Sequence, residues 1–308
     1  MTGEALRSEA LRKVYHSKGA PPVEALSGVS MEVRRRERVA LLGRNGAGKT
    51  TFLKIASTLL RPTSGSIEVF GFDVDRTPEK VRPYIAVVPQ EGKPFFHLTP
   101  REQIFTYLRT RGLSRETARF RTEQSLSRMG LTDFADRLSI TLSGGQRQRT
   151  MVATVIATEA PLLFLDEPTI GMDPFARRAV WASLRDLTDR GSTILLTTHY
   201  LDEAEALSHR LYIVERGHVI VSGTAEELKW AVGGTLKVTL PQAAPEVERF
   251  RSFGECALDG ALLTIIVHPE RLGELMEVAF RAKLSATVGP VTLEEAFLRV
   301  VGRSIDED

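Results

Sequence analysis

The stretch from Gly43 to Thr51 constrains the fold of this chain more than any other. It reads Gly-Arg-Asn-Gly-Ala-Gly-Lys-Thr-Thr and matches the pattern G-x-x-x-x-G-K-[ST] at every fixed position. The apolar run 38–42 before it predicts a buried strand, and the helical spacing of apolar residues in 49–60 predicts a helix. A strand, a glycine-rich loop and a helix in this order indicate an α/β fold whose loop wraps around an anion.

The residue types of this loop suit a nucleotide. Glycines let the backbone approach an anion with its N–H groups pointing inward, and the helix N-terminus adds partial positive charge. Lys49 would hold the β- and γ-phosphates, and Thr50 would bind Mg²⁺. A chance turn before a lysine is the alternative, but the fixed positions coincide in a chain of this length with a probability of about 1%. The nucleotide-binding residues expected here are Gly43, Arg44, Asn45, Gly46, Ala47, Gly48, Lys49, Thr50 and Thr51.

Composition narrows the class of protein. A length of 308 residues predicts about two domains. The chain has no uninterrupted apolar run of about 18 residues, no apolar signal-peptide core and a single cysteine, so we expect a cytoplasmic protein. Its 41 basic and 39 acidic residues give a net charge of +2, which argues against nucleic acid as a partner.

The first part of the chain predicts a β subdomain. Residues 10–15 and 29–33 favour short strands, and Pro21-Pro22 and Ser27-Gly28 predict turns. Tyr15 places a flat ring near the start of a nucleotide-binding unit, where it could stack on adenine. A half-buried strand tyrosine is the equally simple alternative.

A helical subdomain is expected between the sheet strands, over about residues 91–145. Its segments are charged and amphipathic, and Thr99 with Glu102 predicts a capping box. At its end, a serine and two glycines open a helix over 146–157 and form a second corner suited to an anion. Taken alone this is a weak signal, because many helices begin this way. The residues concerned are Ser143, Gly144, Gly145 and Gln146.

Three further polar side chains follow apolar runs that predict buried strands. Residues 162–165 end in Asp166 and Glu167, the run 85–88 leads to Gln90, and the run 192–198 ends in His199. Open α/β sheets bind ligands at the carboxyl edge of their strands. There, an aspartate can hold Mg²⁺ and a glutamate can polarise an attacking water. A helix cap would explain one carboxylate but not an apolar run that ends in two.

The last part of the chain predicts a separate small domain. Gly233-Gly234 would be a hinge, which gives domains of 1–232 and 233–308. Beyond it, the order β-α-β-β-α-β with a trailing helix over 292–301 suggests a ferredoxin-like α+β fold. No chemical motif occurs in it.

Together these motifs resemble the ATPase subunit of an ATP-binding cassette (ABC) transporter, over about residues 8–230. The segment Leu142-Ser-Gly-Gly-Gln146 combined with Asp166-Glu167 is highly specific to that family. The tail, notably Pro290 to Phe297, is similar to that of the drug-efflux, daunorubicin-resistance-like group of exporter ATPases. Two positions depart from the pattern: Met172 replaces a usual leucine, and His209 stands where an acidic residue is expected.

The resemblance implies an α/β P-loop NTPase core with an N-terminal antiparallel β subdomain and an inserted helical subdomain. It implies ATP and Mg²⁺ as cofactors, with the metal held by Thr50, Gln90 and Asp166. Tyr15 would stack on adenine. Glu167, His199, Gln90 and Lys49 would act on the γ-phosphate and the water. Ser143, Gly144, Gly145, Gln146 and Asp173 would contact ATP, the first and third of them the γ-phosphate of ATP held by a second subunit.

The function implied is that of an ATP-hydrolysing subunit of an export system. It would form a head-to-tail dimer around two ATP molecules and drive separate integral membrane permease subunits from the cytoplasmic face of the membrane. An importer subunit is an alternative that only the tail disfavours. A soluble ABC ATPase of translation or DNA repair usually has two cassettes or a long coiled-coil insertion, and neither is evident here. A small-molecule kinase would leave Ser143 and His199 unexplained.

Overall fold

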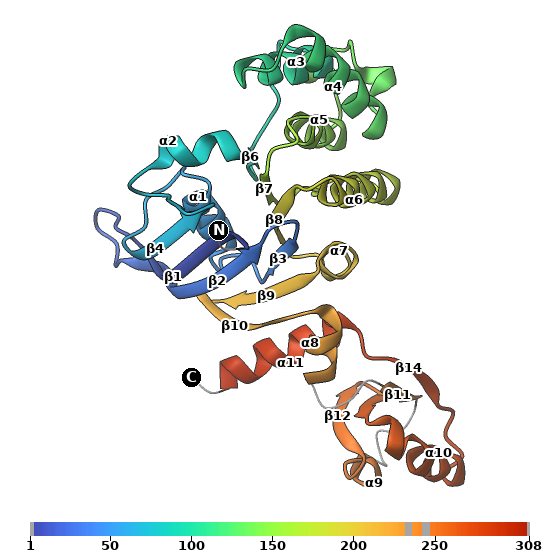
Figure 1. Ribbon diagram of the computed structural model, residues 1–308. Coiled ribbons are helices and arrows are strands. Elements are labelled where there is room, and N and C mark those ends of the chain that lie inside the picture. The colour runs from blue at the N-terminus through green and yellow to red at the C-terminus, as the bar shows by residue number, and fades with distance from the viewer. Residues whose placement is uncertain (1–2, 232–235, 242–246, 307–308) are drawn as a thin grey trace. The chain divides into compact units, whose positions relative to one another are not determined.

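A computed structural model describes residues 3–231, 236–241 and 247–306 (Figure 1). The chain forms two compact units, residues 1–221 and 222–308, here called the N-terminal and C-terminal units. The sequence placed the boundary after residue 232, whereas the structure places it between Val221 and Ser222. The reason is that helix α8 (Ala225–Ala231) packs against α11 (Leu293–Asp306) of the C-terminal unit. The expected hinge Gly233-Gly234 lies outside the described residues.

A six-stranded sheet in the order β10-β9-β3-β8-β7-β6 forms the centre of the N-terminal unit. Its strands β9, β3, β8, β7 and β6 are parallel. Their side chains are almost entirely buried, as is typical of parallel sheets covered on both faces. The strands are β3 (Arg38–Leu42), β6 (Ile85–Val88), β7 (Leu162–Asp166), β8 (Thr193–Thr198), β9 (Arg210–Glu215) and β10 (His218–Gly223).

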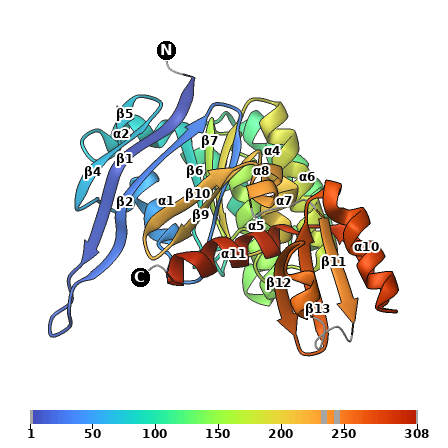
Figure 2. The ribbon, with the colours of Figure 1, turned by 90° about the horizontal axis from the view of Figure 1, so that it is seen from below.

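A second, antiparallel sheet has the order β2-β1-β4-β5. Strands β1 (Glu4–Tyr15) and β2 (Val23–Arg34) form a long hairpin (Figure 2), joined by β4 (Ser64–Val69) and β5 (Phe72–Asp73). This confirms the antiparallel β subdomain. The prediction of a turn at Ser27-Gly28 is wrong, because both residues lie inside β2. Leu11 pairs with Val29 and Arg12 with Ser27, so Gly28, at φ +82°, is taken up in a bulge of the strand.

Helix α1 (Lys49–Ala56) contacts both sheets of the N-terminal unit. Its buried residues Phe52, Leu53, Ile55 and Ala56 belong to the main hydrophobic core, which also includes residues of β1, β2, β3 and β4. The glycine-rich loop therefore opens a helix that is fixed on two sides.

The inserted helices pack on one another. Helices α3 (Pro100–Thr110) and α4 (Arg115–Arg128) contact each other, and both contact α5 (Gly144–Ile156). A short helix, α2 (Pro78–Val81), precedes them. The capping box predicted at the start of α3 is confirmed. The Thr99 hydroxyl accepts a hydrogen bond from the Glu102 amide, and the Glu102 carboxylate accepts one from the Thr99 amide. Among the described residues, no helix combines the length and apolar character needed to cross a bilayer.

Helices α6 (Pro174–Asp189) and α7 (Leu201–Leu207) complete the N-terminal unit and contact each other and β8. The start of α6 follows from Asp173, which accepts hydrogen bonds from the Phe175 and Ala176 amides, and from Pro174 at the first helical position.

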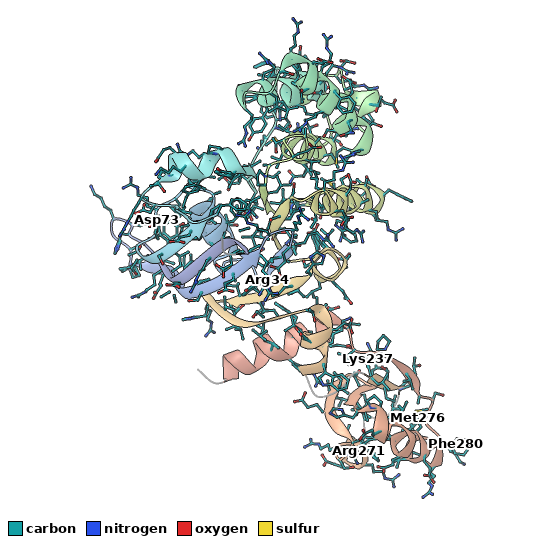
Figure 3. The ribbon with its side chains drawn as sticks, viewed as in Figure 1. Arg34, Asp73, Lys237, Arg271, Met276 and Phe280 are labelled. Atoms are coloured by element: carbon teal, nitrogen blue, oxygen red, sulfur yellow. The ribbon has the colours of Figure 1, made fainter. Side chains whose placement is uncertain are left out.

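The C-terminal unit confirms the ferredoxin-like prediction. Its antiparallel sheet has the order β12-β13-β11-β14, and the elements follow as β11 (Leu236–Pro241), α9 (Val247–Phe250), β12 (Gly254–Asp259), β13 (Leu262–Val267), α10 (Leu272–Arg281) and β14 (Thr287–Pro290). Residues of α10, such as Leu275, pack into the core of this unit, whereas Phe280 on the same helix is exposed (Figure 3). The opposite face of β13 contributes Ile266 to a small cluster with Ala296 of α11.

Candidate functional site

The glycine-rich loop turns directly from β3 into α1, and two of its glycines are required by close backbone contacts. A Cβ on Gly43 would lie 2.2 Å from the Val214 carbonyl oxygen. Gly48 has φ +105°, and a Cβ there would lie 2.4 Å from the Ala25 carbonyl oxygen. Larger residues would push the loop out of this path. The turn between β9 and β10 supports it from outside, because the Gly217 amide donates to the Ala47 carbonyl at 3.0 Å.

Lys49 is held inside this loop. Its side chain is 6% exposed, and its Nζ donates to the carbonyl oxygens of Gly43 and Arg44 at 2.7 and 3.1 Å. Glu167 Oε1 lies 3.9 Å from the same nitrogen. Burial lowers the pKa of the ammonium, and the carboxylates of Glu167 and Asp166 act in the opposite direction. The loop thus presents a positive charge at its centre, as an anion requires.

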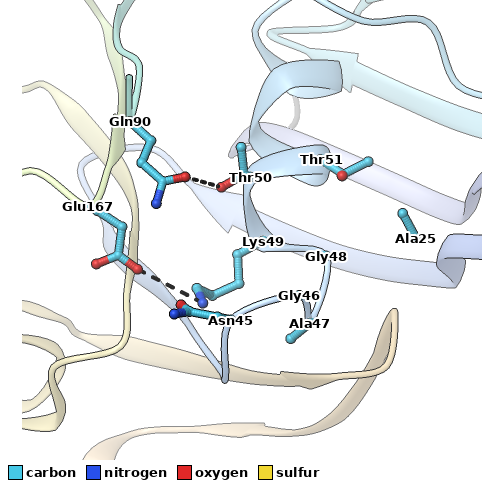
Figure 4. A pocket seen from close by; sticks show the side chains of 10 residues that line it. All are labelled: Ala25, Asn45, Gly46, Ala47, Gly48, Lys49, Thr50, Thr51, Gln90 and Glu167. Carbon is cyan, nitrogen blue, oxygen red and sulfur yellow. Dashed lines mark hydrogen bonds and ion pairs between the residues drawn. The ribbon is translucent and has the colours of Figure 1, made fainter. Parts of the chain in front are cut away.

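A pocket of about 250 Å³ opens over this loop (Figure 4). It is lined by Ala25, Asn45, Gly46, Ala47, Gly48, Lys49, Thr50, Thr51, Gln90 and Glu167. Most of these were expected from the sequence. Ala25 was not, because its place depends on how β2 crosses the loop, and nothing in the residues around it signals a ligand. Gly217 was missed for the same reason.

Three oxygen-bearing side chains from different elements meet beside the pocket. The Thr50 hydroxyl lies 3.1 Å from Asp166 Oδ1 and 3.3 Å from Gln90 Oε1. The Thr197 hydroxyl also donates to Asp166 and holds its carboxylate in place. Hydroxyl, amide and carboxylate oxygens suit Mg²⁺, which uses few protein ligands together with phosphates and water. The described residues contain no cluster of three or more acidic, histidine or cysteine ligands, as a dedicated metal cage would need.

Glu167 and His199 form a pair at the carboxyl ends of β7 and β8. Glu167 Oε2 lies 2.8 Å from His199 Nδ1, and the Glu167 side chain is only 3% exposed. The Glu167 backbone has φ +50°, in a region that a non-glycine residue seldom occupies. Its amide donates to both oxygens of Thr197. The strand pairing therefore holds Glu167 in a strained backbone conformation in which its carboxylate faces the pocket. Such strain is common at functional sites.

Tyr15 lies at the end of β1 beside α1. Its hydroxyl is 3.3 Å from Thr51 Oγ1, its ring is 5.4 Å from Lys13 Nζ, and it is 38% exposed. An exposed ring next to the loop is compatible with stacking on a base, which stays a prediction.

The second anion-receptive corner lies elsewhere. Ser143 caps α5: its hydroxyl accepts the Gln146 amide at 3.2 Å, and Gln146 Oε1 accepts the Ser143 amide at 2.9 Å. Gly144 lines a different hollow, together with Gln90, Lys93 and Gly171. Asp173 caps α6, and the amides of Ala176 and Phe175 hold the pKa of its carboxyl below the usual value. Ser143, Gly144, Gly145, Gln146 and Asp173 are not among the described residues that line the pocket over the loop.

Residues 26–170 match the ABC transporter family. The chain is 37% identical to the daunorubicin/doxorubicin resistance ATP-binding protein DrrA of Streptomyces peucetius, over 98% of this chain and 94% of that protein. The chain belongs to the ABC transporter family. It is therefore an ATP-binding protein and an ATPase of that family.

Two further similarities extend this result. The chain is 36% identical to the Nod factor export ATP-binding protein I of Burkholderia pseudomallei, over 91% of this chain and 93% of that protein. It also resembles a solved dimeric ATP-binding cassette in a post-hydrolysis state bound to ADP and Pi, with a TM-score of 0.67 and 26% identity over 71% of this chain and 98% of that one. The structural neighbour thus shares the ABC ATPase fold of the N-terminal unit.

Proposed function

We propose that this chain is the ATP-hydrolysing subunit of an ABC exporter, which works as a dimer docked on separate membrane permease subunits. The observation that carries the proposal is the convergence of Lys49, Thr50, Asp166, Glu167 and His199 at one sheet edge. The relatives named for resistance and for Nod factor export support the direction of transport.

Hydrolysis would be an in-line attack by water on the γ-phosphate of ATP. Lys49 would offset charge on the β- and γ-phosphates, and Thr50, Gln90 and Asp166 would hold Mg²⁺, which supplies further charge stabilisation. Glu167 would accept the proton of the water. His199, hydrogen-bonded to the same carboxylate, would orient it and would contact the γ-phosphate.

A second copy of the chain would complete each site. Ser143 and Gly145 open α5, a helix whose N-terminus favours an anion, yet they do not line the pocket of their own chain. The Ser143 hydroxyl uses a lone pair for capping and can still donate its proton. A head-to-tail dimer around two ATP molecules would place this corner over the partner's nucleotide, and the dimeric state of the similar cassette supports such an arrangement.

The permease would dock in a groove of about 380 Å³ between α3 and α5. Its lining is largely apolar and includes Phe95, Leu98, Tyr107 and Met151. Phe95 is 72% exposed, and its amide donates to Gln103 Oε1, which fixes the segment that leads back to Gln90. A helix or loop of a membrane subunit in this groove would press on the same segment that carries a proposed magnesium ligand.

The catalytic assignment is tested by Glu167→Gln, which keeps the size of the side chain and removes its basicity. We expect ATP to bind and turnover to fall by roughly 10²-fold or more, the range for loss of a general base. Single-turnover hydrolysis and nucleotide binding measured on the same preparation separate the two steps. Turnover equal to that of the parent would remove Glu167 from this role.

The docking assignment is tested by Phe95→Glu, with Phe120→Glu as the control. Phe120 is similarly exposed, at 66%, but lies on α4 away from the groove. We expect the first variant to lose co-purification with a co-expressed membrane permease subunit, because a carboxylate disfavours burial in an apolar groove. Loss in both variants, or in neither, would argue against this groove.

A further inference from the structure

Glu203 is a fully buried carboxyl group that the proposed chemistry does not use. It lies on α7, has 0% of its surface exposed, and burial raises the pKa of its carboxyl. Burying such a group is costly unless hydrogen bonds compensate. Hydrogen bonds from the side chains of Thr169 and Trp181 to its Oε1 offset part of that cost here. Because the buried Glu203 carboxyl is held in one position, it fixes the positions of its hydrogen-bond partners.

The first partner connects Glu203 to Glu167. The Thr169 hydroxyl donates to Glu203 Oε1 at 2.8 Å, and Thr169 stands two residues after Glu167. The turn between them is closed by the Ile170 amide, which donates to the Glu167 carbonyl at 3.3 Å. The orientation of the Glu167 backbone, at φ +50°, therefore depends on where this turn is anchored.

The second set of partners connects Glu203 to His199. The Trp181 indole N–H donates to the same oxygen at 3.1 Å. The Arg177 guanidinium lies over the Trp181 ring at 5.2 Å and over the Tyr200 ring at 4.9 Å. The Tyr200 ring in turn lies 4.1 Å from the His199 ring. These contacts lead from Glu203 to the imidazole without a break.

We propose that Glu203 is a positioning residue for ATP hydrolysis, whose buried Oε1 ties the turn after Glu167 to the α6–α7 contacts that orient His199. The contacts form a closed circuit through Thr169, Glu203, Trp181, Arg177, Tyr200 and His199 that returns to Glu167 through the 2.8 Å bond. This inference rests on the roles proposed for Glu167 and His199. It adds that the relative position of the two groups is set from the buried side of α7.

A positioning role can be distinguished from a purely stabilising role by comparing three variants of the full-length chain, namely Glu203→Ala, Glu203→Gln and Leu184→Ala. The amide oxygen of glutamine can accept from both Thr169 and Trp181, whereas alanine cannot. Leu184 is equally buried, lies on α6 and has an apolar side chain that makes none of the hydrogen bonds of the circuit, so its truncation destabilises the packing of α6 without removing any of them. We expect Glu203→Ala to lower kcat roughly tenfold to a hundredfold with KM unchanged, as for a slightly misplaced catalytic group.

Glu203→Gln should recover kcat to within about threefold of the parent, and Leu184→Ala should lower thermal stability without this loss of kcat. Thr169→Val, which keeps the shape and removes only the donor, covers the case in which Glu203→Ala does not fold. It should lower kcat with KM unchanged, because it removes the bond that ties the turn after Glu167 to Glu203. Equal kcat in Glu203→Ala and the parent, or equal loss in Leu184→Ala, would overturn the inference. If Glu167→Gln itself leaves turnover intact, it is the proposed catalytic role that fails.

Discussion

At the scale of single residues, the site depends on backbone positions that few side chains permit. Gly43 passes so close to the Val214 carbonyl that only a hydrogen atom fits there. Glu167 is the opposite case, because a residue with a long side chain adopts a backbone conformation that favours glycine. The first position serves the path of the loop, and the second serves the direction of a carboxylate.

The substitution Gly43→Ala tests this steric requirement. Because the new Cβ would lie 2.2 Å from the Val214 carbonyl oxygen, the loop or β9 must shift. We expect ATP affinity to fall at least about tenfold and stability to fall by about 1–3 kcal/mol, the usual cost of overpacking. Isothermal titration with ATP and chemical unfolding measure the two effects.

Gly273→Ala is the matched control. Gly273 lies on α10, and a Cβ there meets nothing within 4 Å. Alanine is the better helix former, so this variant should be as stable as the parent or slightly more so. Unchanged ATP affinity in Gly43→Ala would show that the loop adjusts without cost.

At the scale of elements, the site is a product of strand order. Strands β6, β7 and β8 are far apart in the sequence, yet they lie side by side and end at one edge of the sheet. That edge delivers Gln90, Asp166, Glu167 and His199 to the loop that follows β3. In the C-terminal unit, α11 is attached to the sheet by Lys237 Nζ, 2.7 Å from Glu295 Oε1, and by an ion pair between Arg299 and Glu255.

This attachment predicts a pH dependence. Burial of Glu295 acts to raise its pKa, but the hydrogen bonds from Lys237 and Thr292 outweigh it and hold the pKa below the ordinary value of 4.5. The folded-state pKa is thus lower than the unfolded one. The resulting stability is present above about pH 4.5 and is lost as the pH falls through the lowered value.

The measurement compares the melting temperatures of the parent and Glu295→Gln across this range. The parent should melt a few degrees higher at neutral pH, and the difference should shrink below pH 4.5. Glu277→Gln, which removes an exposed pair with Arg281, should change little at any pH because exposed pairs contribute little. A difference that stays constant with pH would contradict the assignment.

At the scale of the whole molecule, the two groups of residues that we assign to one composite catalytic site lie in separate places. The loop side holds Lys49, Thr50 and the carboxylates, and the α5 side holds Ser143 and Gly145. A single copy leaves the second half unused. Two copies arranged head to tail would use both halves twice, which is the arrangement we propose.

Mixed dimers of Lys49→Ala and Ser143→Arg chains test this arrangement. In such a dimer, the intact loop of one chain faces the intact α5 corner of the other, so one complete site remains. We expect about half of the parent turnover if the sites act independently, whereas each variant alone should be nearly inactive. Mixed dimers as inactive as the single variants would show that Ser143 does not act across the interface.

The features that depend on neighbouring residues could be predicted from the sequence. The strand, loop and helix around Gly43 to Thr51, the capping box at Thr99 and the apolar strand that ends in Asp166-Glu167 all follow from local spacing and chemistry. The β-α-β-β-α-β order of the C-terminal unit followed in the same way. The prediction of a turn at Ser27-Gly28 was wrong because long-range pairing with β1 outweighed the local preference of these residues for a turn.

Which of these features meet depends on the tertiary structure. The bond from Thr50 to Asp166 and the pair of Glu167 with His199 join residues that no local pattern relates. Ala25 lines the pocket and Gly217 contacts the loop because backbone segments pass close to one another there, not because of their side-chain chemistry. Glu203 gained its partners from the packing of α7 on α6. The physical reason is that hydrogen bonds and close contacts act over a few ångströms, and sheet order and helix packing alone bring distant segments within that range.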